Sequence, residues 1–255
     1  MKTNNANPVR DKRILITAGP TKEAIDPVRY ISNHSSGKMG YALAKALHGY
    51  GADVTLISGP TDLAEVLPPG KTIHVTSALQ MLEAAEPFFV RTDIAIFAAA
   101  VADYRPECVA ANKIKKKSTD VYLKLVPNPD IAFEFSKCKS PMQVSIGFAL
   151  ETGDLLENAR EKLARKGFDF IVMNSANEAG AGFGVDTNRV SILNSEDAIS
   201  EYDLKSKDAV ATDIIDHLFR HLYRSRELVM PAQNRVDNAV SGVAGSRHEL
   251  VAGFL

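Results

Sequence analysis

Three consecutive segments decide the fold: ILITA at residues 14–18, GPTKEAIDPVRYISNHSSGKMG at residues 19–40 and YALAKAL at residues 41–47. The first is an apolar strand and the last is one face of an amphipathic helix. Between them lies a long polar loop whose end is rich in Ser and Gly. The free N–H groups of a first helical turn carry partial positive charge, so this arrangement predicts an anion site.

The start of this helix supports the prediction without matching a known phosphate motif. Ser35, Ser36 and Gly37 offer hydroxyls and a close approach to the backbone. Lys38 is followed by Met39, so the Walker pattern fails, and the dinucleotide pattern G-x-G-x-x-G is also missing. The alternative is an ordinary strand–helix turn, but such turns take roughly 2–6 residues, and longer loops are usually functional or disordered.

The composition is typical of a soluble globular protein. The chain has 255 residues, of which 45% are hydrophobic and 24% charged. The net charge of −1 gives no global attraction to nucleic acid or to a membrane surface. Cys108 and Cys138 form no disulfide framework or metal motif, and the polar N-terminus lacks a signal peptide. We therefore expect a cytoplasmic protein that binds neither nucleic acid nor membrane.

Apolar runs alternate with helical patterns along most of the chain. This alternation predicts an α/β fold, a Rossmann-like, mostly parallel sheet flanked by helices. Ligands of such sheets bind beyond the carboxyl ends of the strands. The predicted strands are 13–18, 53–58, 72–75, 93–100, 142–148 and 169–173, and the predicted helices are 41–50, 77–89, 128–137, 154–166 and 206–224.

Two segments depart from this alternation. Residues 104–126 are irregular apart from a half-exposed strand at 121–125, and we expect a flap or partner-contacting arm there. Residues 188–194 and 198–203 predict a C-terminal antiparallel hairpin.

The ends of the chain lack the periodicity of its middle. The prediction is a flexible leader at residues 1–12, a single Rossmann-like domain at 13–229 and a poorly ordered tail at 230–255.

Five motifs in order resemble one enzyme family. They are the loop at 19–40, AAAVADYRP at 98–106, KIKK at 113–116, NPDIA at 128–132 and GFALET at 147–152. Together they are similar to the phosphopantothenate–cysteine ligases, or phosphopantothenoylcysteine synthetases, of coenzyme A biosynthesis. Many bacteria fuse this domain behind a flavin-dependent decarboxylase. Because only 12 residues precede the first predicted strand, we expect a stand-alone synthetase that works with a separately encoded decarboxylase.

The resemblance implies a two-step ligation. The carboxylate of 4'-phosphopantothenate attacks the α-phosphate of CTP, with Mg²⁺ present, and forms an acyl-cytidylate with release of pyrophosphate. The amine of cysteine then displaces CMP. Such chemistry needs fixed N–H donors and cations at the developing charge rather than a protein nucleophile. The resemblance favours CTP and leaves ATP open, and it implies a homodimer.

On the substrate side, the resemblance assigns catalytic roles to Lys113, which would neutralise phosphate charge, and Asn33, which would contact the acyl intermediate. Arg29 would hold a substrate phosphate or carboxylate through its planar fork. The plain alternatives are a solvated lysine-rich flap, a helix cap by Asn33 and a surface arginine. The remaining substrate-binding residues are Ser35, Ser36, Gly37, Lys38, Met39, Gly40, Ala99 and Ala100.

On the nucleotide side, Asp103 and the backbone of Ala99 and Ala100 match the part of the family site that meets cytidine. Asp103 could instead be a cap or a turn residue, and Phe148, which would cover the base, could be plain core. The remaining nucleotide-binding residues are Lys113, Pro129, Asp130, Ile131, Ala132, Lys162 and Lys166; the last two could form a solvated pair on one helix face.

Two other functions compete with the ligase. One is an NAD(P)-dependent oxidoreductase, the usual function for a Rossmann-like pattern, which the missing glycine fingerprint disfavours. The other is a non-catalytic nucleotide-binding subunit, which would be expected to lose motif residues, whereas Asn33, Asp103 and Lys113 are all present.

Overall fold

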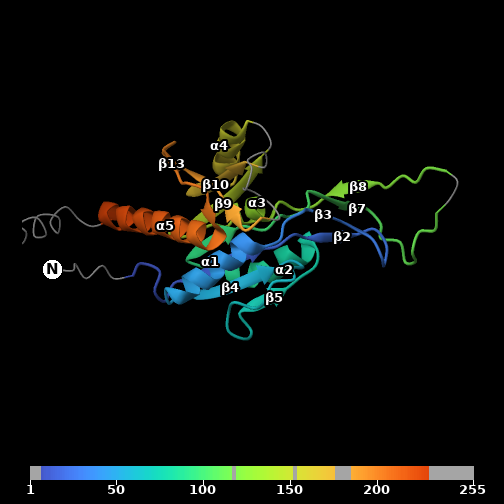
Figure 1. The fold of residues 1–255 in the computed structure, drawn as a ribbon, viewed down its shortest axis with the longest axis horizontal. Helices are drawn as coiled ribbons and strands as arrows, with labels where there is room; N and C mark the ends of the chain where they lie inside the picture. Colours follow the sequence, from blue (N-terminus) through green and yellow to red (C-terminus); the bar gives the residue numbers. More distant parts are fainter. Residues whose placement is uncertain (1–6, 117–118, 152–153, 176–184, 230–255) are drawn as a thin grey trace, which may run out of the picture. The chain divides into compact units, whose positions relative to one another are not determined.

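A computed structural model describes residues 7–116, 119–151, 154–175 and 185–229 of the chain. Its centre is an eight-stranded sheet (Figure 1). In chain order the strands of this sheet are β1 (Arg13–Ala18), β4 (Asp53–Ser58), β5 (Thr72–His74), β6 (Ile94–Phe97), β9 (Val144–Glu151), β10 (Phe170–Ser175), β12 (Ser191–Asn194) and β13 (Ile199–Glu201).

Strand β1 lies inside the sheet and pairs in parallel on both sides. Ile16 is in register with Leu56 of β4 and with Ile96 of β6. The order across the sheet is β13-β12-β10-β9-β6-β1-β4-β5, and only β12 and β13 run antiparallel to their neighbours. The prediction of a mostly parallel Rossmann-like sheet with a C-terminal antiparallel hairpin is confirmed. The chain order reverses between β1 and β6, which is where such sheets open a crevice.

Helices connect the parallel strands. Helix α2 begins with a capping box, in which the Ser77 hydroxyl accepts from the Gln80 N–H and the Gln80 side chain accepts from the Ser77 N–H. Helix α1 begins differently, after Gly37 in the left-handed conformation at φ 78°, with no side-chain cap. The helices are α1 (Lys38–Gly49), α2 (Ala78–Phe89), α3 (Ile131–Ser136), α4 (Leu155–Arg165) and α5 (Lys207–Val229).

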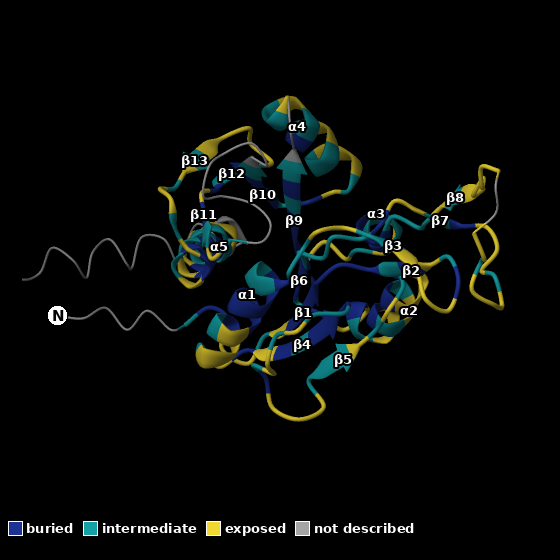
Figure 2. Cartoon of the chain, turned by 45° about the vertical axis from the view of Figure 1, so that its right-hand side comes forward, coloured by how far each residue is buried: buried dark blue, intermediate teal, exposed yellow. Residues whose placement is uncertain are grey.

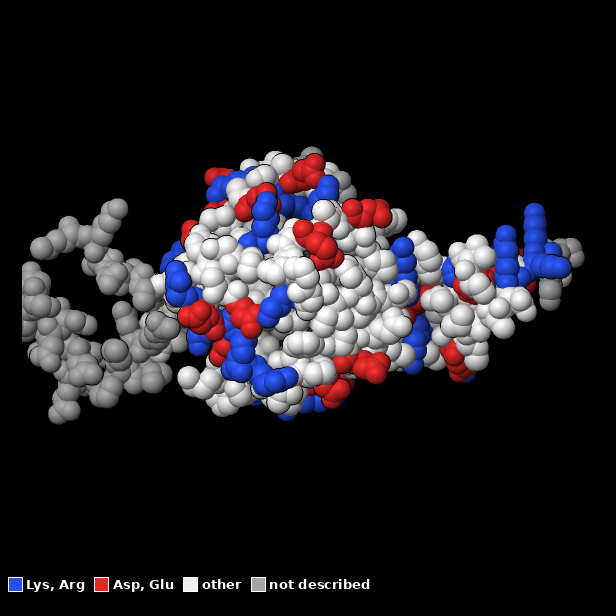
Figure 3. All heavy atoms as spheres, turned by 90° about the horizontal axis from the view of Figure 1, so that it is seen from below, with Lys and Arg blue, Asp and Glu red and all other residues white. Residues whose placement is uncertain are grey.

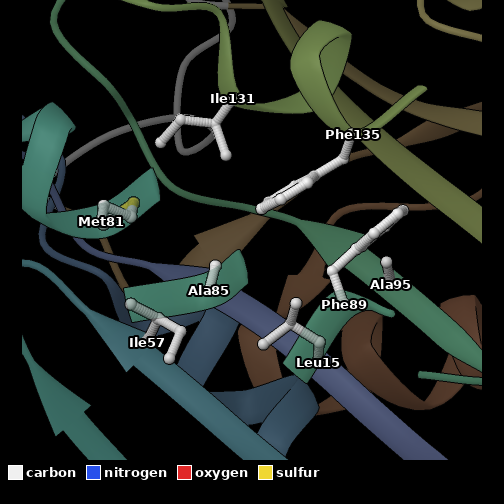
Figure 4. Packing of buried hydrophobic residues seen from close by; sticks show 8 residues of the cluster. All are labelled: Leu15, Ile57, Met81, Ala85, Phe89, Ala95, Ile131 and Phe135. Carbon is white, nitrogen blue, oxygen red and sulfur yellow. The ribbon is translucent and has the colours of Figure 1, made fainter. Parts of the chain in front are cut away.

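One face of the sheet is covered by α2 and α3. The ring of Phe89 in α2 stacks on Phe135 in α3, with centroids 4.4 Å apart (Figure 4). Helix α1 covers the opposite face of β1 and β4 (Figure 2). Side chains of β1 alternate between these faces, so its apolar run is buried on both sides. The buried hydrophobic cluster between the sheet and helices α2 and α3 contains Leu15, Ile57, Met81, Ala85, Phe89, Ala95, Ile131 and Phe135.

The chain divides into two compact units inside α5. The first unit extends to Ile215, and its part of α5 buries Val210, Ala211 and Ile214. The described part of the second unit, residues 216–229, consists of the remaining turns of this helix.

Short strand pairs lie outside the main sheet. The long loop after β1 folds into a hairpin of β2 (Lys22–Ala24) and β3 (Tyr30–Ser32), which the sequence did not predict. Strands β7 (Tyr104–Pro106) and β8 (Leu125–Pro127) pair at the base of a projecting segment, residues 104–127, which we call the arm (Figure 1).

Several predicted boundaries differ from the structure, and three of the differences have a clear cause. The strand expected at 121–125 lies at 125–127, where it can pair with β7. The strand expected at 93–100 ends at Phe97, because the chain leaves the ladder to bond with the loop after β1. Residue 188 belongs to another pair, β11 (Thr187–Asn188) with β14 (Lys205–Ser206).

The predicted leader is partly folded. Residues 7–12 form a turn in which Val9 is fully buried. The Asn7 side chain donates to the Tyr50 carbonyl at 2.5 Å, and the Asp11 N–H donates to Gly51 at 2.9 Å. The prediction of a flexible leader is therefore wrong for these residues, while residues 1–6 and the tail at 230–255 lie outside the described chain.

No helix within the described ranges is long and apolar enough to cross a membrane.

The aromatic stack predicts a large effect of one substitution. Phe89→Ala removes a ring that is 2% exposed, so the free energy of unfolding should fall by about 3–5 kcal/mol. Its neighbour Val90 is 78% exposed, so Val90→Ala should change stability by less than about 0.5 kcal/mol. Urea unfolding of both variants measures the difference, and equal effects would contradict this packing.

Candidate active site

A cavity of about 490 Å³ lies at the carboxyl ends of β1 and β6. Thr17 and Phe97, the last pair in the ladder between these strands, both line it. The cavity therefore occupies the position where the strand order reverses, and its volume is within the range of small-molecule sites, roughly 300–1,000 Å³.

The start of α1 forms one wall. Residues Ser35 to Gly40 line the cavity, and the Gly37 N–H donates to the Ser35 hydroxyl at 3.3 Å. No side chain caps the helix at Gly37, so the first-turn N–H groups face an anion site without a competing carboxylate. A Cβ on Gly40 would lie 2.5 Å from the Ala18 Cβ, so glycine lets α1 approach β1 closely.

Two lysines flank this helix start. Lys38 forms an ion pair with Asp186, whose pKa is lowered by that contact. Lys207, at the start of α5, is only 8% exposed and donates to the Val185 carbonyl at 2.6 Å. Burial lowers the pKa of Lys207, and the charge of Lys38 lowers it further, while Asp186 opposes the shift. This end of the cavity therefore holds two lysines beside one exposed carboxylate, Asp186.

The opposite wall comes from α3 and α4. Asp130 caps α3 by accepting from the Phe133 N–H at 3.3 Å, so its own carboxylate occupies this helix start. The same carboxylate contacts Lys166 at 2.9 Å and Arg165 at 3.4 Å. The Phe133 N–H and the Asp130 carboxylate at the start of α3 are thus already engaged within the chain.

The segment after β6 crosses the cavity between these walls. The Asn33 amide donates to the Ala100 carbonyl at 2.9 Å, which fixes the orientation of the Asn33 side chain. The Ala100 N–H donates to Gly19 at 2.9 Å, so Ala100 uses both of its backbone groups within the chain. The carbonyl of Asp103 accepts from the Asn128 N–H at 2.7 Å, while the Asp103 side chain is exposed at the rim.

The structure brings all but two of the predicted site residues together. Asn33 does not cap α1, which begins after Gly37, so that alternative is wrong. Lys162 and Lys166 both face the cavity rather than only solvent. The lining includes Asn33, Ser35, Ser36, Gly37, Lys38, Met39, Gly40, Ala99, Ala100, Asp103, Pro129, Asp130, Ile131, Ala132, Phe148, Lys162 and Lys166.

Arg29 and Lys113 lie away from this lining. The Arg29 guanidinium is engaged by Asp26, with Nε 3.0 Å from the carboxylate, so the expected contact with a substrate anion in this cavity is not formed by its side chain. Lys113 is exposed in the arm. Figure 3 shows basic side chains gathered toward the end of the arm. Lys115 and Lys116, which follow Lys113 in the sequence, are exposed as well.

Sequence reasoning missed several polar residues of the lining. Asn174 follows the predicted strand 169–173 at its carboxyl end, so its position was a usable signal. The sequence carried no usable signal for Asn188 and Lys207, because only the tertiary fold brings the β11–β14 pair beside α1. Arg165, in the last turn of α4, also lines the cavity, and a basic residue there is equally expected from its favourable charge at a helix end.

The fold and the cavity define an α/β protein with a cavity of small-molecule size at the strand reversal. Residues 9–222 match the family described as DNA/pantothenate metabolism flavoprotein, C-terminal domain. The chain belongs to this family.

The related proteins are longer than this chain. A coenzyme A biosynthesis bifunctional protein CoaBC from Vibrio parahaemolyticus is 44% identical over 212 residues, covering 81% of this chain and 52% of the relative. A cysteine/cysteine sulfinic acid decarboxylase from an unknown prokaryotic organism is 49% identical over 208 residues, covering 82% and 58%. This chain thus spans little more than half of these proteins.

Solved structures share the fold. The crystal structure of the C-terminal domain of a CoaBC protein has a TM-score of 0.71 at 38% identity, covering 86% of this chain and 100% of that one. A Cab2 mutant in complex with phosphopantothenate-cysteine has a TM-score of 0.66 at 17% identity, covering 86% and 89%, and this similarity concerns the fold alone.

The contact between α1 and β1 yields a matched pair of substitutions. Gly40→Ala should lower the free energy of unfolding by about 1–3 kcal/mol, because its Cβ would overlap Ala18. Gly49→Ala, in the same helix with nothing within 4 Å of the added Cβ, should be neutral or raise stability by up to about 1 kcal/mol. Denaturant titration compares the two, and an equal response would contradict the close contact.

Proposed function

We propose that the protein ligates 4'-phosphopantothenate to L-cysteine through an acyl-cytidylate formed from CTP. One observation carries the proposal. A single cavity at the strand reversal is lined by motif residues from segments distant in the sequence: Asn33, Ser35 to Gly40, Ala99 to Asp103 and Pro129 to Ala132. Membership in the family and the 38% identity to a CoaBC C-terminal domain support it.

The chemistry has two displacements. In the first, a carboxylate oxygen bonds to the α-phosphorus of CTP and the bond to pyrophosphate breaks. In the second, the cysteine nitrogen bonds to the acyl carbon, loses a proton, and the carbon–oxygen bond to CMP breaks. Negative charge grows on phosphate oxygens first and on the acyl oxygen next, so fixed donors and cations are the groups that accelerate both steps.

The α1 wall suits the phosphate charge. Its uncapped first turn presents N–H groups, and Lys38 and Lys207 add positive charge beside it. Asn33, held by the Ala100 carbonyl, presents its remaining amide atoms to the acyl group. In this proposal the wall binds the reacting phosphate and carboxyl groups.

The opposite wall suits the nucleoside. Phe148 offers an aromatic surface for the base, and Asp103 offers acceptors for an amino group or a ribose hydroxyl. Lys162 and Lys166 supply charge near the phosphates. Recognition of an amino group by Asp103 does not separate cytosine from adenine, so CTP is proposed on the resemblance and ATP is the competing nucleotide.

A magnesium ion fits this donor set. Mg²⁺ bound to a triphosphate keeps several waters and needs only one or two protein carboxylates. The lining contains Asp103 and Asp130, of which Asp130 is paired with Lys166. The ion would neutralise charge on the leaving pyrophosphate.

We further propose a homodimer that contacts through the arm. Tyr122 is 89% exposed, and Tyr104, Val121 and Leu125 are also more than two-fifths exposed, which is costly unless a partner covers them. Light scattering behind a sizing column distinguishes dimer from monomer. A separate decarboxylase would consume the product.

The reaction is tested by pyrophosphate release. Release should require both phosphopantothenate and CTP, and CMP should appear only when cysteine is added. Parallel reactions with ATP establish the nucleotide preference. Oxidation of a reduced nicotinamide without pyrophosphate release would instead favour the oxidoreductase.

Lys113 is tested by a neighbouring control. Lys113→Gln should fold normally and reduce turnover by about 100-fold or more, as expected for loss of a charge that stabilises a transition state. Lys116→Gln, also exposed in the same basic cluster, should retain wild-type turnover. Wild-type rates in Lys113→Gln would remove its assigned role.

A further inference from the structure

The turn between β2 and β3 contains a buried carboxylate surrounded by donors. The Asp26 side chain has 0% exposure. Its Oδ1 accepts from the backbone N–H groups of Val28 and Arg29, each at 2.9 Å. Its Oδ2 accepts from the Arg29 guanidinium and, at 3.0 Å, from the backbone N–H of Ile114. The last bond joins residues 88 positions apart in the chain.

Arg29 completes the contact from the other side. Its Nη2 donates to the carbonyl of Ile114 at 2.9 Å, so the Asp26–Arg29 pair holds both backbone groups of one arm residue. A further backbone bond, from Ala110 to Ile25 at 3.0 Å, joins the same turn to the arm. Ile114 stands directly between Lys113 and Lys115 in the basic cluster.

We propose that Asp26 and Arg29 are positioning residues that fix the arm at Ile114 and so place Lys113. We call the contact of the Asp26–Arg29 pair with Ile114 the clamp. The role of Lys113 rests on the proposed function, whereas the clamp does not. A charged pair that binds both the N–H and the C=O of one residue fixes its position and orientation, and charge-assisted bonds are stronger than neutral ones. The planar fork of arginine lets one side chain reach the carboxylate and the carbonyl together.

The charge state of the pair agrees with this role. The Arg29 guanidinium, with the backbone donors, holds the pKa of Asp26 well below its usual range although burial opposes this shift. Asp26 is therefore ionised near neutral pH, where it can accept from every donor around it. An amide at this position would place its own N–H₂ group among donors or lose acceptor capacity.

Hydrogen exchange of the arm tests the clamp directly. In Asp26→Asn and in Arg29→Gln, exchange of the peptide containing residues 110–116 should rise by about tenfold or more, because a hydrogen bond to a charged group is lost. Trypsin should also cleave after Lys113 and Lys115 faster than in the wild type. Arg29→Lys keeps the charge without the fork and should give an intermediate exchange rate.

Two matched controls separate the clamp from general loosening. Asp93→Asn removes another carboxylate that accepts from an arginine and a backbone N–H, at Arg13, far from the arm in the sequence. Glu107→Gln breaks an exposed ion pair with Lys124 inside the arm. Neither should change exchange at 110–116. Arg29 is about half-exposed, so its variants should fold even if Asp26→Asn does not.

Turnover measurements test the link to Lys113. Asp26→Asn and Arg29→Gln should lower kcat with little change in KM for the nucleotide, and adding either to Lys113→Gln should cause no further loss. Unchanged exchange at 110–116 in both variants would overturn the clamp, and a full additional loss on top of Lys113→Gln would overturn the positioning role. If the wild-type protein has no ligase activity but its variants still show faster exchange at 110–116, the proposed function is refuted and the clamp is supported.

Discussion

The parallel pairing of β1 on both of its edges is the constraint on which the site depends. Strands β4 and β6 both run parallel to β1. The chain therefore crosses one face of the sheet after β1, through α1, and crosses the other face, through α2, before it enters β6. The loop after β1 and the segment after β6 meet at Ala100, and both line the cavity together with Thr17 and Phe97. The short contact of Gly40 with Ala18 holds α1 close to this opening.

The cavity walls differ in how freely their charged groups can meet a ligand. At the α1 wall the helix start has no side-chain cap, and the lysines beside it are balanced by one exposed acid, Asp186. At the other wall Asp130 already neutralises Lys166 and caps α3. We therefore propose that the phosphate groups of a ligand bind at the α1 wall and that the nucleoside binds beside Phe148.

The sequence predicts the scaffold well because its signals are local. An apolar run such as DIAIFAAA, a capping residue such as Ser77, and the length of the loop at 19–40 each report on neighbouring residues. The resemblance then identified most of the cavity lining, whose roles stay predictions. The errors have a common cause, which is that the features concerned depend on contacts between segments distant in the sequence. These features are the hairpin of β2 and β3, the packed turn at 7–12 and the wall around Asn188 and Lys207.

Arg29 illustrates the same limit. Its sequence position fits an anion-binding residue, but its side chain is held by Asp26 and by the Ile114 carbonyl. The arm thus enters the account as an anchored element of the site, although Lys113 itself stands outside the cavity. Under the proposed function, ligation would depend on two separate parts of the chain, the cavity and the arm.

The central claim is that this cavity activates a carboxylate by joining it to a nucleotide. Mass spectrometry of the protein-bound fraction, after incubation with phosphopantothenate, CTP and Mg²⁺ but without cysteine, tests it most directly. The account predicts an accumulated phosphopantothenoyl-cytidylate that disappears when cysteine is added. Recovery of only unreacted phosphopantothenate and CTP, from protein that is folded and has bound both, would contradict it.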